Sequence, residues 1–157
     1  MQTTVDKDTF AIGVVGAGSW GTALANLLAE KGFGVDQWVY EAEVLAQMID
    51  TRENQRFLPG VPLSGNLHPS GDLETVVGGK DLVLVVTPSH VTRQTIERCS
   101  RAVTPQTVVV SASKGIENGT HLTMSGVMQE TLVNIPSHRL AVLSGPSLAR
   151  EVARSLP

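Results

Sequence analysis

The chain has 157 residues, of which 41% are hydrophobic and 17% are charged, and its formal net charge is −3. This length and composition predict one globular domain with its own hydrophobic core. The slightly acidic balance, without any basic run, argues against a nucleic-acid partner, and no apolar stretch reaches the roughly 18 residues that span a bilayer.

Apolar runs typical of strands alternate with segments of helical periodicity. The predicted elements, in chain order, are strand 10–15, helix 19–31, strand 35–40, helix 42–50, helix 72–77, strand 82–86, helix 91–101, strand 107–111, helix 122–132, strand 140–143 and helix 147–155. Residues 59–71 contain three prolines and three glycines, which predicts a loop with at most a short strand at 66–68. Asp72 is the predicted cap of the short helix that follows.

The composition of the later strands indicates the fold class. LVLVV (82–86) and TVVVS (107–111) are apolar in the way expected of parallel strands buried on both faces. Strands that alternate with helices form right-handed βαβ units. We therefore predict an α/β fold with a doubly wound, mainly parallel sheet and helices on both faces.

The first predicted strand leads into IGVVGAGSWG, in which Gly16, Gly18 and Gly21 have the spacing of a dinucleotide-binding loop. The first glycine permits a tight turn, the second lets the backbone approach a pyrophosphate, and the third lets the helix pack on the strand. The helix start adds N–H groups and a positive dipole end, and Ser19 adds a hydroxyl. A turn without a ligand is the alternative, but the flanking strand and helix favour a Rossmann-type dinucleotide site.

Glu41 follows the second predicted strand, 20 residues after Gly21. A carboxylate at this place accepts hydrogen bonds from the ribose hydroxyls of NAD and repels the 2′-phosphate of NADP. The sequence therefore favours NAD, with NADP as the alternative coenzyme. A solvated acid at a helix start is the other interpretation of Glu41. Tyr40 is predicted to lie against the adenine, with ordinary strand packing as its alternative.

Polar residues and glycines follow three later strands, in TPSH (87–90), ASKG (112–115) and SGPS (144–147). In open parallel sheets, ligands bind beyond these carboxyl ends. Lys114 is placed to hold an anionic substrate and to polarise a carbonyl as hydride arrives; a solvated loop lysine is the alternative. The SGPS turn is suited to directing backbone N–H groups and Ser147 at a phosphate or carboxylate.

Six segments extend this interpretation. They are GAGSWGTALA (16–25), WVYE (38–41), Asn54 with FLPG (57–60), TPS (87–89), SKGIE (113–117) and SGPSLAREVA (144–153). In this order they closely resemble the NAD(P)-dependent sn-glycerol-3-phosphate dehydrogenase family. The resemblance runs from about residue 10 to residue 157 and covers the N-terminal, coenzyme-binding half of that family.

The resemblance implies a role for each matching residue. Together with Glu41, the predicted coenzyme contacts are Gly16, Ala17, Gly18, Ser19, Trp20, Gly21, Tyr40, Val91, Lys114 and Ala149. Lys114 is also implied as the catalytic residue and as a substrate contact, and Gly145 and Ser147 match substrate-binding positions. The implied reaction interconverts glycerol 3-phosphate and dihydroxyacetone phosphate by hydride transfer.

The chain departs from the family pattern in three places. Leu148 stands where the family usually has phenylalanine, and residues 61–67 match a leucine–proline segment only loosely. The family's second catalytic lysine lies in a C-terminal helical substrate domain, which we expect beyond Pro157. We therefore expect residues 1–157 to form a dinucleotide-binding domain that by itself binds NAD(H) weakly and has little or no turnover. Whether the full-length enzyme is a homodimer stays open.

Two other functions are consistent with parts of the sequence. A non-catalytic NAD(H)-sensing module needs the glycine loop but neither Lys114 nor the SGPS turn. A two-domain dehydrogenase for another hydroxy compound is a third interpretation, against which the ordered SKG and SGPS segments argue. The four histidines lack metal-ligand spacing, so no metal site is predicted.

Two features bear on the compartment. The first ten residues, MQTTVDKDTF, lack the basic and apolar regions of a secretory signal peptide. Cys99 is the only cysteine, so no internal disulfide can form. Both features predict a cytoplasmic protein.

Overall fold

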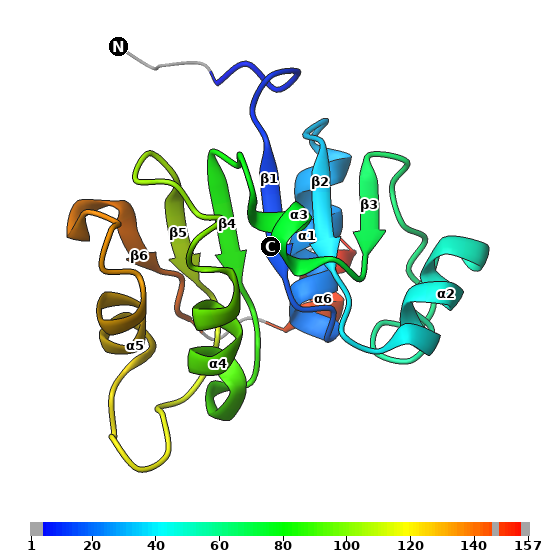
Figure 1. The fold of residues 1–157 in the computed structure, drawn as a ribbon. Coiled ribbons are helices and arrows are strands. Elements are labelled where there is room, and N and C mark those ends of the chain that lie inside the picture. The colour runs from blue at the N-terminus through cyan, green and yellow to red at the C-terminus, as the bar shows by residue number, and fades with distance from the viewer. Residues whose placement is uncertain (1–4, 146–147, 155–157) are drawn as a thin grey trace.

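Six strands form one sheet in which each neighbouring pair runs parallel (Figure 1). The structure is a computed structural model that describes residues 5–145 and 148–154. The strand order is β3-β2-β1-β4-β5-β6. The strands are β1 (Ile12–Val15), β2 (Val35–Trp38), β3 (Leu67–Ser70), β4 (Leu82–Val85), β5 (Val108–Ser111) and β6 (Leu140–Val142).

Helices cover both faces of this sheet (Figure 1). They are α1 (Ser19–Glu30), α2 (Ala42–Thr51), α3 (Leu73–Val77), α4 (Ser89–Cys99), α5 (Met124–Thr131) and α6 (Ala149–Ala153), with a single 3₁₀ turn at Ser137–Arg139. The predicted α/β fold, with a doubly wound parallel sheet between helices, is confirmed. Both ends of the predicted helix 147–155 extend past α6, and residues 147 and 155 lie outside the described residues.

Strand β3 is longer than predicted and begins one residue later. It pairs with β2 over its whole length, and Pro69 stands opposite Gln37. Proline has no N–H to donate to a ladder, so it is tolerated where one side of a strand is unpaired. Because β3 lies at one edge of the sheet, the proline-rich segment can still form a strand.

Caps decide where three helices begin. The predicted cap of α3 is confirmed, because the Asp72 carboxylate accepts hydrogen bonds from the N–H groups of Glu74 and Thr75. Helix α5 begins two residues later than predicted, since the Thr123 hydroxyl caps it by accepting from the N–H of Gly126. Helix α4 begins two residues earlier than predicted, directly after Pro88 at the N-cap position, where a missing N–H costs no helical hydrogen bond.

Successive strand residues alternate between two hydrophobic cores. One core joins the sheet to α1 and α2 and includes Ile12, Val14, Leu84, Ala25 and Met48. The other joins it to α3, α4 and α5 and includes Val15, Val83, Val85, Ile96 and Met128. Side chains packed on both faces hold the strands rigidly, so the loops at their carboxyl ends have a fixed base.

Candidate functional site

The candidate site lies at the carboxyl ends of the central strands. Strand β1 pairs with β2 on one side and with β4 on the other. The chain continues from β1 to β2 and from β4 to β5, toward opposite edges of the sheet. A crevice opens between the loops that follow β1 and β4. The glycine-rich loop follows β1 at this point, and α1 begins at Ser19. Gly18 is the N-cap and has no side chain to accept from the first N–H groups of α1.

The three glycines of this loop differ in what an added methyl group would meet. Gly16 has a φ of +119°, and a Cβ there would lie 2.3 Å from the Val86 carbonyl oxygen. A Cβ at Gly21 would lie 2.5 Å from the Gly16 carbonyl oxygen. A Cβ at Gly18 would have nothing within 4 Å. The protein's own packing therefore requires glycine at 16 and 21, whereas the open space at 18 leaves room for a ligand to approach the backbone.

Three fully buried polar side chains hold the glycine loop from inside the domain. The Asn54 amide donates to the Ala17 carbonyl oxygen at 2.8 Å and to the Thr22 hydroxyl at 2.9 Å. The Gln37 amide donates to the Gly16 carbonyl oxygen at 3.0 Å, while its own Oε1 has no partner among the described residues. These bonds fix the two loop carbonyls toward the interior.

A cleft of about 450 Å³ opens beside the loop. Its lining includes six of the predicted coenzyme contacts: Gly16, Ala17, Gly18, Tyr40, Glu41 and Val91. Glu41 is the N-cap of α2 but its carboxylate forms no capping hydrogen bond. Tyr40 is 74% exposed and lies past the end of β2, so it is not buried within the sheet.

Aromatic and cationic groups form one wall of the same cleft. The Trp38 indole donates to the Gly71 carbonyl oxygen and packs edge-on against the Tyr40 ring, with 5.8 Å between the ring centroids. The Arg98 guanidinium lies 5.7 Å from the Trp38 ring centroid and forms no ion pair within the described part of the chain. The cleft thus carries one carboxylate, Glu41, and one cation, Arg98.

Two more clefts continue from the first toward Lys114. The middle cleft, of about 420 Å³, shares Gly18 with the first and is also lined by Ser19, Trp20, Gly21, Lys114 and Ala149. The largest, of about 790 Å³, shares Trp20 and Lys114 with the middle one and extends to Gly145. The Lys114 ammonium lies 5.8 Å from the Trp20 ring centroid, within cation–π range.

The clefts therefore bring together every predicted site residue that the structure describes. Ser147 lies outside the described residues. The sequence interpretation missed Thr22, Gln37 and Arg98. A polar glutamine inside the apolar run VDQWVY was a usable signal for Gln37. Nothing local marked Arg98, which extends from α4 over the Trp38 ring at the end of β2.

The described residues contain neither a candidate metal site nor a candidate membrane-spanning helix. Over residues 5–145 and 148–154, no group of three or more histidine, cysteine or acidic side chains is arranged to hold a metal ion. Among the helices described there, none combines the length and the apolarity needed to cross a membrane.

A parallel sheet of this strand order, with a glycine-rich loop and a helix N-terminus at its switch point, defines a Rossmann-type domain. Residues 11–157 match the family described as NAD-dependent glycerol-3-phosphate dehydrogenase N-terminus. The chain belongs to this family, and the resemblance predicted from the six segments is confirmed.

Individual relatives agree with this assignment. The chain is 52% identical over 146 residues to the glycerol-3-phosphate dehydrogenase [NAD(P)+] of Syntrophobacter fumaroxidans, covering 93% of this chain and 43% of that protein. Among solved structures, the glycerol-3-phosphate dehydrogenase of Coxiella burnetii superposes with a TM-score of 0.86 at 37% identity, covering 94% of this chain and 44% of that one. Glycerol-3-phosphate dehydrogenase GPD1 of Saccharomyces cerevisiae superposes with a TM-score of 0.80 at 32% identity, covering 92% of this chain and 44% of that one. The chain thus spans less than half the length of these relatives.

Proposed function

We propose that this chain is the coenzyme-binding domain of a glycerol-3-phosphate dehydrogenase, which interconverts glycerol 3-phosphate and dihydroxyacetone phosphate. The observation that carries the proposal is the continuity of the clefts. Gly18 belongs to the first and the middle cleft, and Lys114 belongs to the middle and the largest. A phosphate-binding helix start is thereby joined to a cationic side chain that is suited to an anionic substrate.

The described residues fit a dinucleotide. The open space at Gly18 and the first turn of α1, with Gly16, Ala17, Ser19 and Gly21, would hold the pyrophosphate. Tyr40, Glu41 and Val91 would hold the adenosine half, since they line the first cleft. Trp20, Lys114 and Ala149 would lie along the other half, since they line the middle cleft.

The coenzyme, when bound, supplies the hydride donor or acceptor. The Lys114 ammonium attracts the phosphorylated substrate and donates a hydrogen bond to the oxygen on its reacting carbon. Negative charge grows on that oxygen during reduction of the ketone, so the same bond strengthens in the transition state. Gly145, which lines the largest cleft together with Lys114, would bind the substrate, and the family resemblance implies Ser147 as a further substrate contact. Lys114 is the proposed catalytic residue of this domain.

The charges of the first cleft bear on coenzyme preference. Glu41 favours NAD, because a carboxylate pairs with the ribose hydroxyls and repels a 2′-phosphate. Arg98 lines the same cleft and offers a cation to a phosphorylated ribose. We infer a preference for NAD that retains some use of NADP.

The assembly is proposed on the same basis. Residues 1–157 form the dinucleotide-binding domain, and a helical substrate domain beyond Pro157 completes the active site in a cytoplasmic, full-length enzyme that is a candidate homodimer. The coverage of the relatives, 43% to 44% of their length, supports this division.

The test is the variant Lys114→Ala in the complete dehydrogenase that contains this domain. We expect kcat/KM for dihydroxyacetone phosphate to fall about a thousandfold, since one donor to the developing oxyanion is lost, while the affinity for NADH falls far less, because Lys114 is only one of many proposed coenzyme contacts. Steady-state kinetics and a fluorescence titration of NADH measure the two effects. Wild-type enzyme that binds NADH but reduces no dihydroxyacetone phosphate would favour a coenzyme-sensing module instead, and unchanged kinetics of the variant would remove Lys114 from the mechanism.

A further inference from the structure

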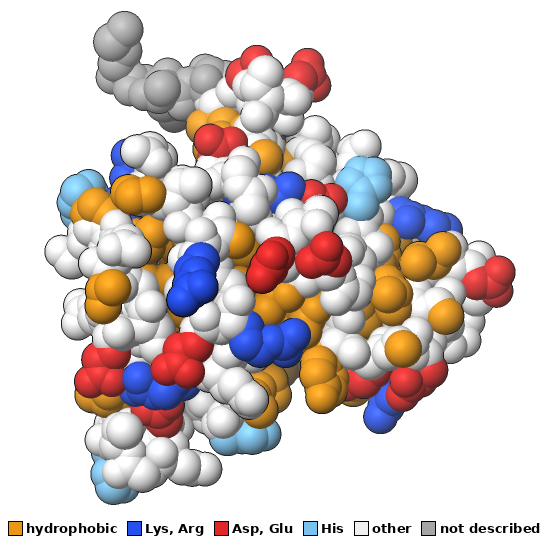
Figure 2. Space-filling view, in the orientation of Figure 1, with side chains coloured by type: hydrophobic (Ala, Val, Ile, Leu, Met, Phe, Trp, Pro, Cys, Tyr) orange, Lys and Arg blue, Asp and Glu red, His pale blue; other side chains and the backbone are white. Residues whose placement is uncertain are grey.

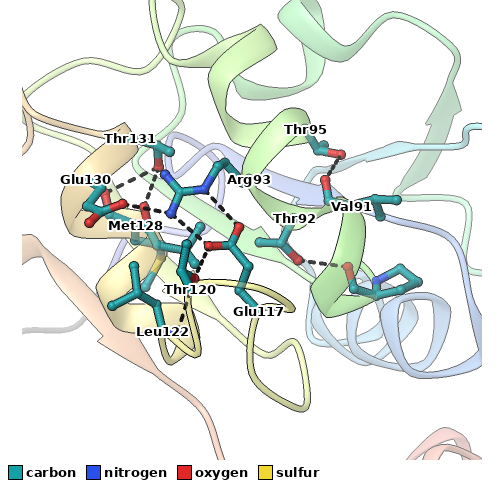
Figure 3. Close-up of polar contacts among 12 residues, drawn as sticks. Val91, Thr92, Arg93, Thr95, Glu117, Thr120, Leu122, Met128, Glu130 and Thr131 are labelled. Carbon is teal, nitrogen blue, oxygen red and sulfur yellow. Dashed lines mark hydrogen bonds and ion pairs between the residues drawn. The ribbon is translucent and has the colours of Figure 1, made fainter.

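Arg93, Glu117 and Glu130 form a cluster of charged side chains (Figure 3). None of the three lines any of the three clefts. Arg93 of α4 forms a two-pronged contact with Glu117: Nε donates to Oε1 and a terminal NH₂ donates to Oε2, both at 2.8 Å. The same NH₂ donates to Glu130 of α5 at 2.7 Å. On the molecular surface, acidic and basic side chains gather over α4 and α5 (Figure 2).

The inner part of this cluster is shielded from solvent. The side chains of Arg93 and Glu117 are 28% and 11% exposed. The surface pair Arg56–Glu43 has a single contact and side chains that are 53% and 72% exposed. Exposed pairs of that kind contribute little, whereas a bidentate, half-buried pair fixes both partners in one geometry.

Glu117 organises the segment that carries Lys114. This segment runs from β5 to α5 and contains only an isolated bridge, between Ile116 and Thr123. The Glu117 carboxylate accepts a hydrogen bond from the Thr120 hydroxyl. The backbone N–H of Glu117 donates to the Leu122 carbonyl oxygen at 2.9 Å. The loop is thus folded around one carboxylate, three residues after Lys114.

Arg93 ties that loop to the helix beside the coenzyme cleft. Helix α4 contributes His90, Val91 and Gln94 to the lining of the first cleft. Its first turn also touches the loop, because a Cβ at Gly115 would lie 3.3 Å from the Ser89 hydroxyl oxygen. The loop that carries Lys114 is therefore bonded to α4 through Arg93 and lies close to α4 at Ser89.

We propose that Arg93 and Glu117 are positioning residues that hold Lys114 at a fixed place relative to the bound coenzyme, with Glu130 orienting the arginine. Neither residue lines any of the three clefts, so they act through the loop and not on the substrate. The inference rests on the proposed role of Lys114.

The first experiment compares Glu117→Gln and Arg93→Lys with the matched control Glu43→Gln in the complete dehydrogenase. Small displacements of a catalytic group cost up to about a hundredfold in rate. We expect Glu117→Gln to lower kcat for dihydroxyacetone phosphate reduction by about that factor, with the KM for NADH changed less than about threefold. Arg93→Lys keeps the charge but loses the two-pronged contact, so an intermediate loss is expected, and Glu43→Gln should match the wild type.

A double variant separates positioning from simple destabilisation. In the Lys114→Ala background, Glu117→Gln should lower the melting temperature but cause no further loss of kcat. An equal loss of kcat in both backgrounds, or a wild-type kcat in Glu117→Gln and Arg93→Lys, would overturn the positioning role. If Lys114→Ala alone retains wild-type kinetics, the proposed function fails first, and the two failures are thereby distinguished.

Discussion

At the scale of single residues, the loop before α1 combines glycines needed for folding with one left open to a ligand. Gly16 and Gly21 are required by backbone atoms that a Cβ would strike, whereas the space around Gly18 is empty. Asn54 and Gln37 hold the carbonyls of the same loop from within. The shape of the loop is therefore supported by contacts within the protein itself.

This difference predicts opposite behaviour for two variants. Gly21→Ala should destabilise the domain by about 1 to 3 kcal/mol, the cost of overpacking, because its methyl group meets the Gly16 carbonyl. Gly18→Ala should change stability by no more than about 1 kcal/mol, the cost of a poorer N-cap, yet weaken NADH binding about tenfold or more. Chemical denaturation and fluorescence titration measure the two effects. Unimpaired NADH binding by Gly18→Ala would contradict the placement of the pyrophosphate.

Glu41 predicts the coenzyme preference of the complete dehydrogenase. Glu41→Gln removes a charge-assisted hydrogen bond to the ribose and a repulsion of the 2′-phosphate, so the kcat/KM ratio of NADH to NADPH should fall about tenfold. Glu43→Gln, two residues further along α2, is the matched control and should leave the ratio unchanged. Equal ratios for Glu41→Gln and the wild type would show that this carboxylate does not interact with the ribose or its 2′-phosphate.

At the scale of elements, α4 has two functions. One part of it lines the coenzyme cleft, and Arg93 connects it to the loop after β5 and to α5. The pKa of Glu117 is lowered from 4.5 to about 2, first because Arg93 donates to its carboxylate and then because Thr120 does. Folding therefore favours the ionised form of Glu117.

The sign of this shift predicts how stability depends on pH. The contribution of the ionised Glu117 to folding stability is complete above the unfolded-state pKa, near 4.5. It is lost as the pH falls toward 2. We expect the melting temperature to decline over that range, and to decline less steeply in Glu117→Gln. Glu43→Gln should retain the wild-type slope. Thermal unfolding between pH 2 and pH 6 provides the measurement, and identical slopes in Glu117→Gln and the wild type would contradict the pairing.

Element boundaries were predictable where the reason was local. The apolar run 82–86 contains strand β4, and Asp72 caps helix α3. Both could be predicted because burial on both faces and side-chain capping each require particular residue types at adjacent positions. Strand β3 was only partly predicted, because its proline argued against a strand. Its position at the edge of the sheet depends on pairing with β2, which the local sequence does not show.

At the scale of the whole molecule, the three clefts reach from the glycine loop to residues 142–145. The largest cleft is lined by the loop after β5, by α5 and by residues 142–145. Its apolar rim includes Val142 and Leu143, which are 49% and 46% exposed. These two exposed apolar side chains are available for contact with a further domain or subunit.

The isolated chain should therefore bind coenzyme without effective catalysis. We expect residues 1–157 to bind NADH measurably and to reduce dihydroxyacetone phosphate at a rate on the order of a thousandfold below that of the complete dehydrogenase, because the proposed substrate domain would supply further acid–base groups. Isothermal titration and a coupled spectrophotometric assay test both parts. Turnover comparable to that of the complete enzyme would refute the two-domain division.

The sequence by itself determined the alternation of strands and helices, the glycine loop, the acid after β2 and the lysine after β5, because each depends on neighbouring residues. Only the tertiary structure decided the strand order, the presence of Arg98 and Glu41 in one cleft and the pairing of Arg93 with Glu117. These contacts join residues that are far apart along the chain, 24 positions for Arg93 and Glu117. No local pattern encodes them, because the packing of helices on the sheet brings them together.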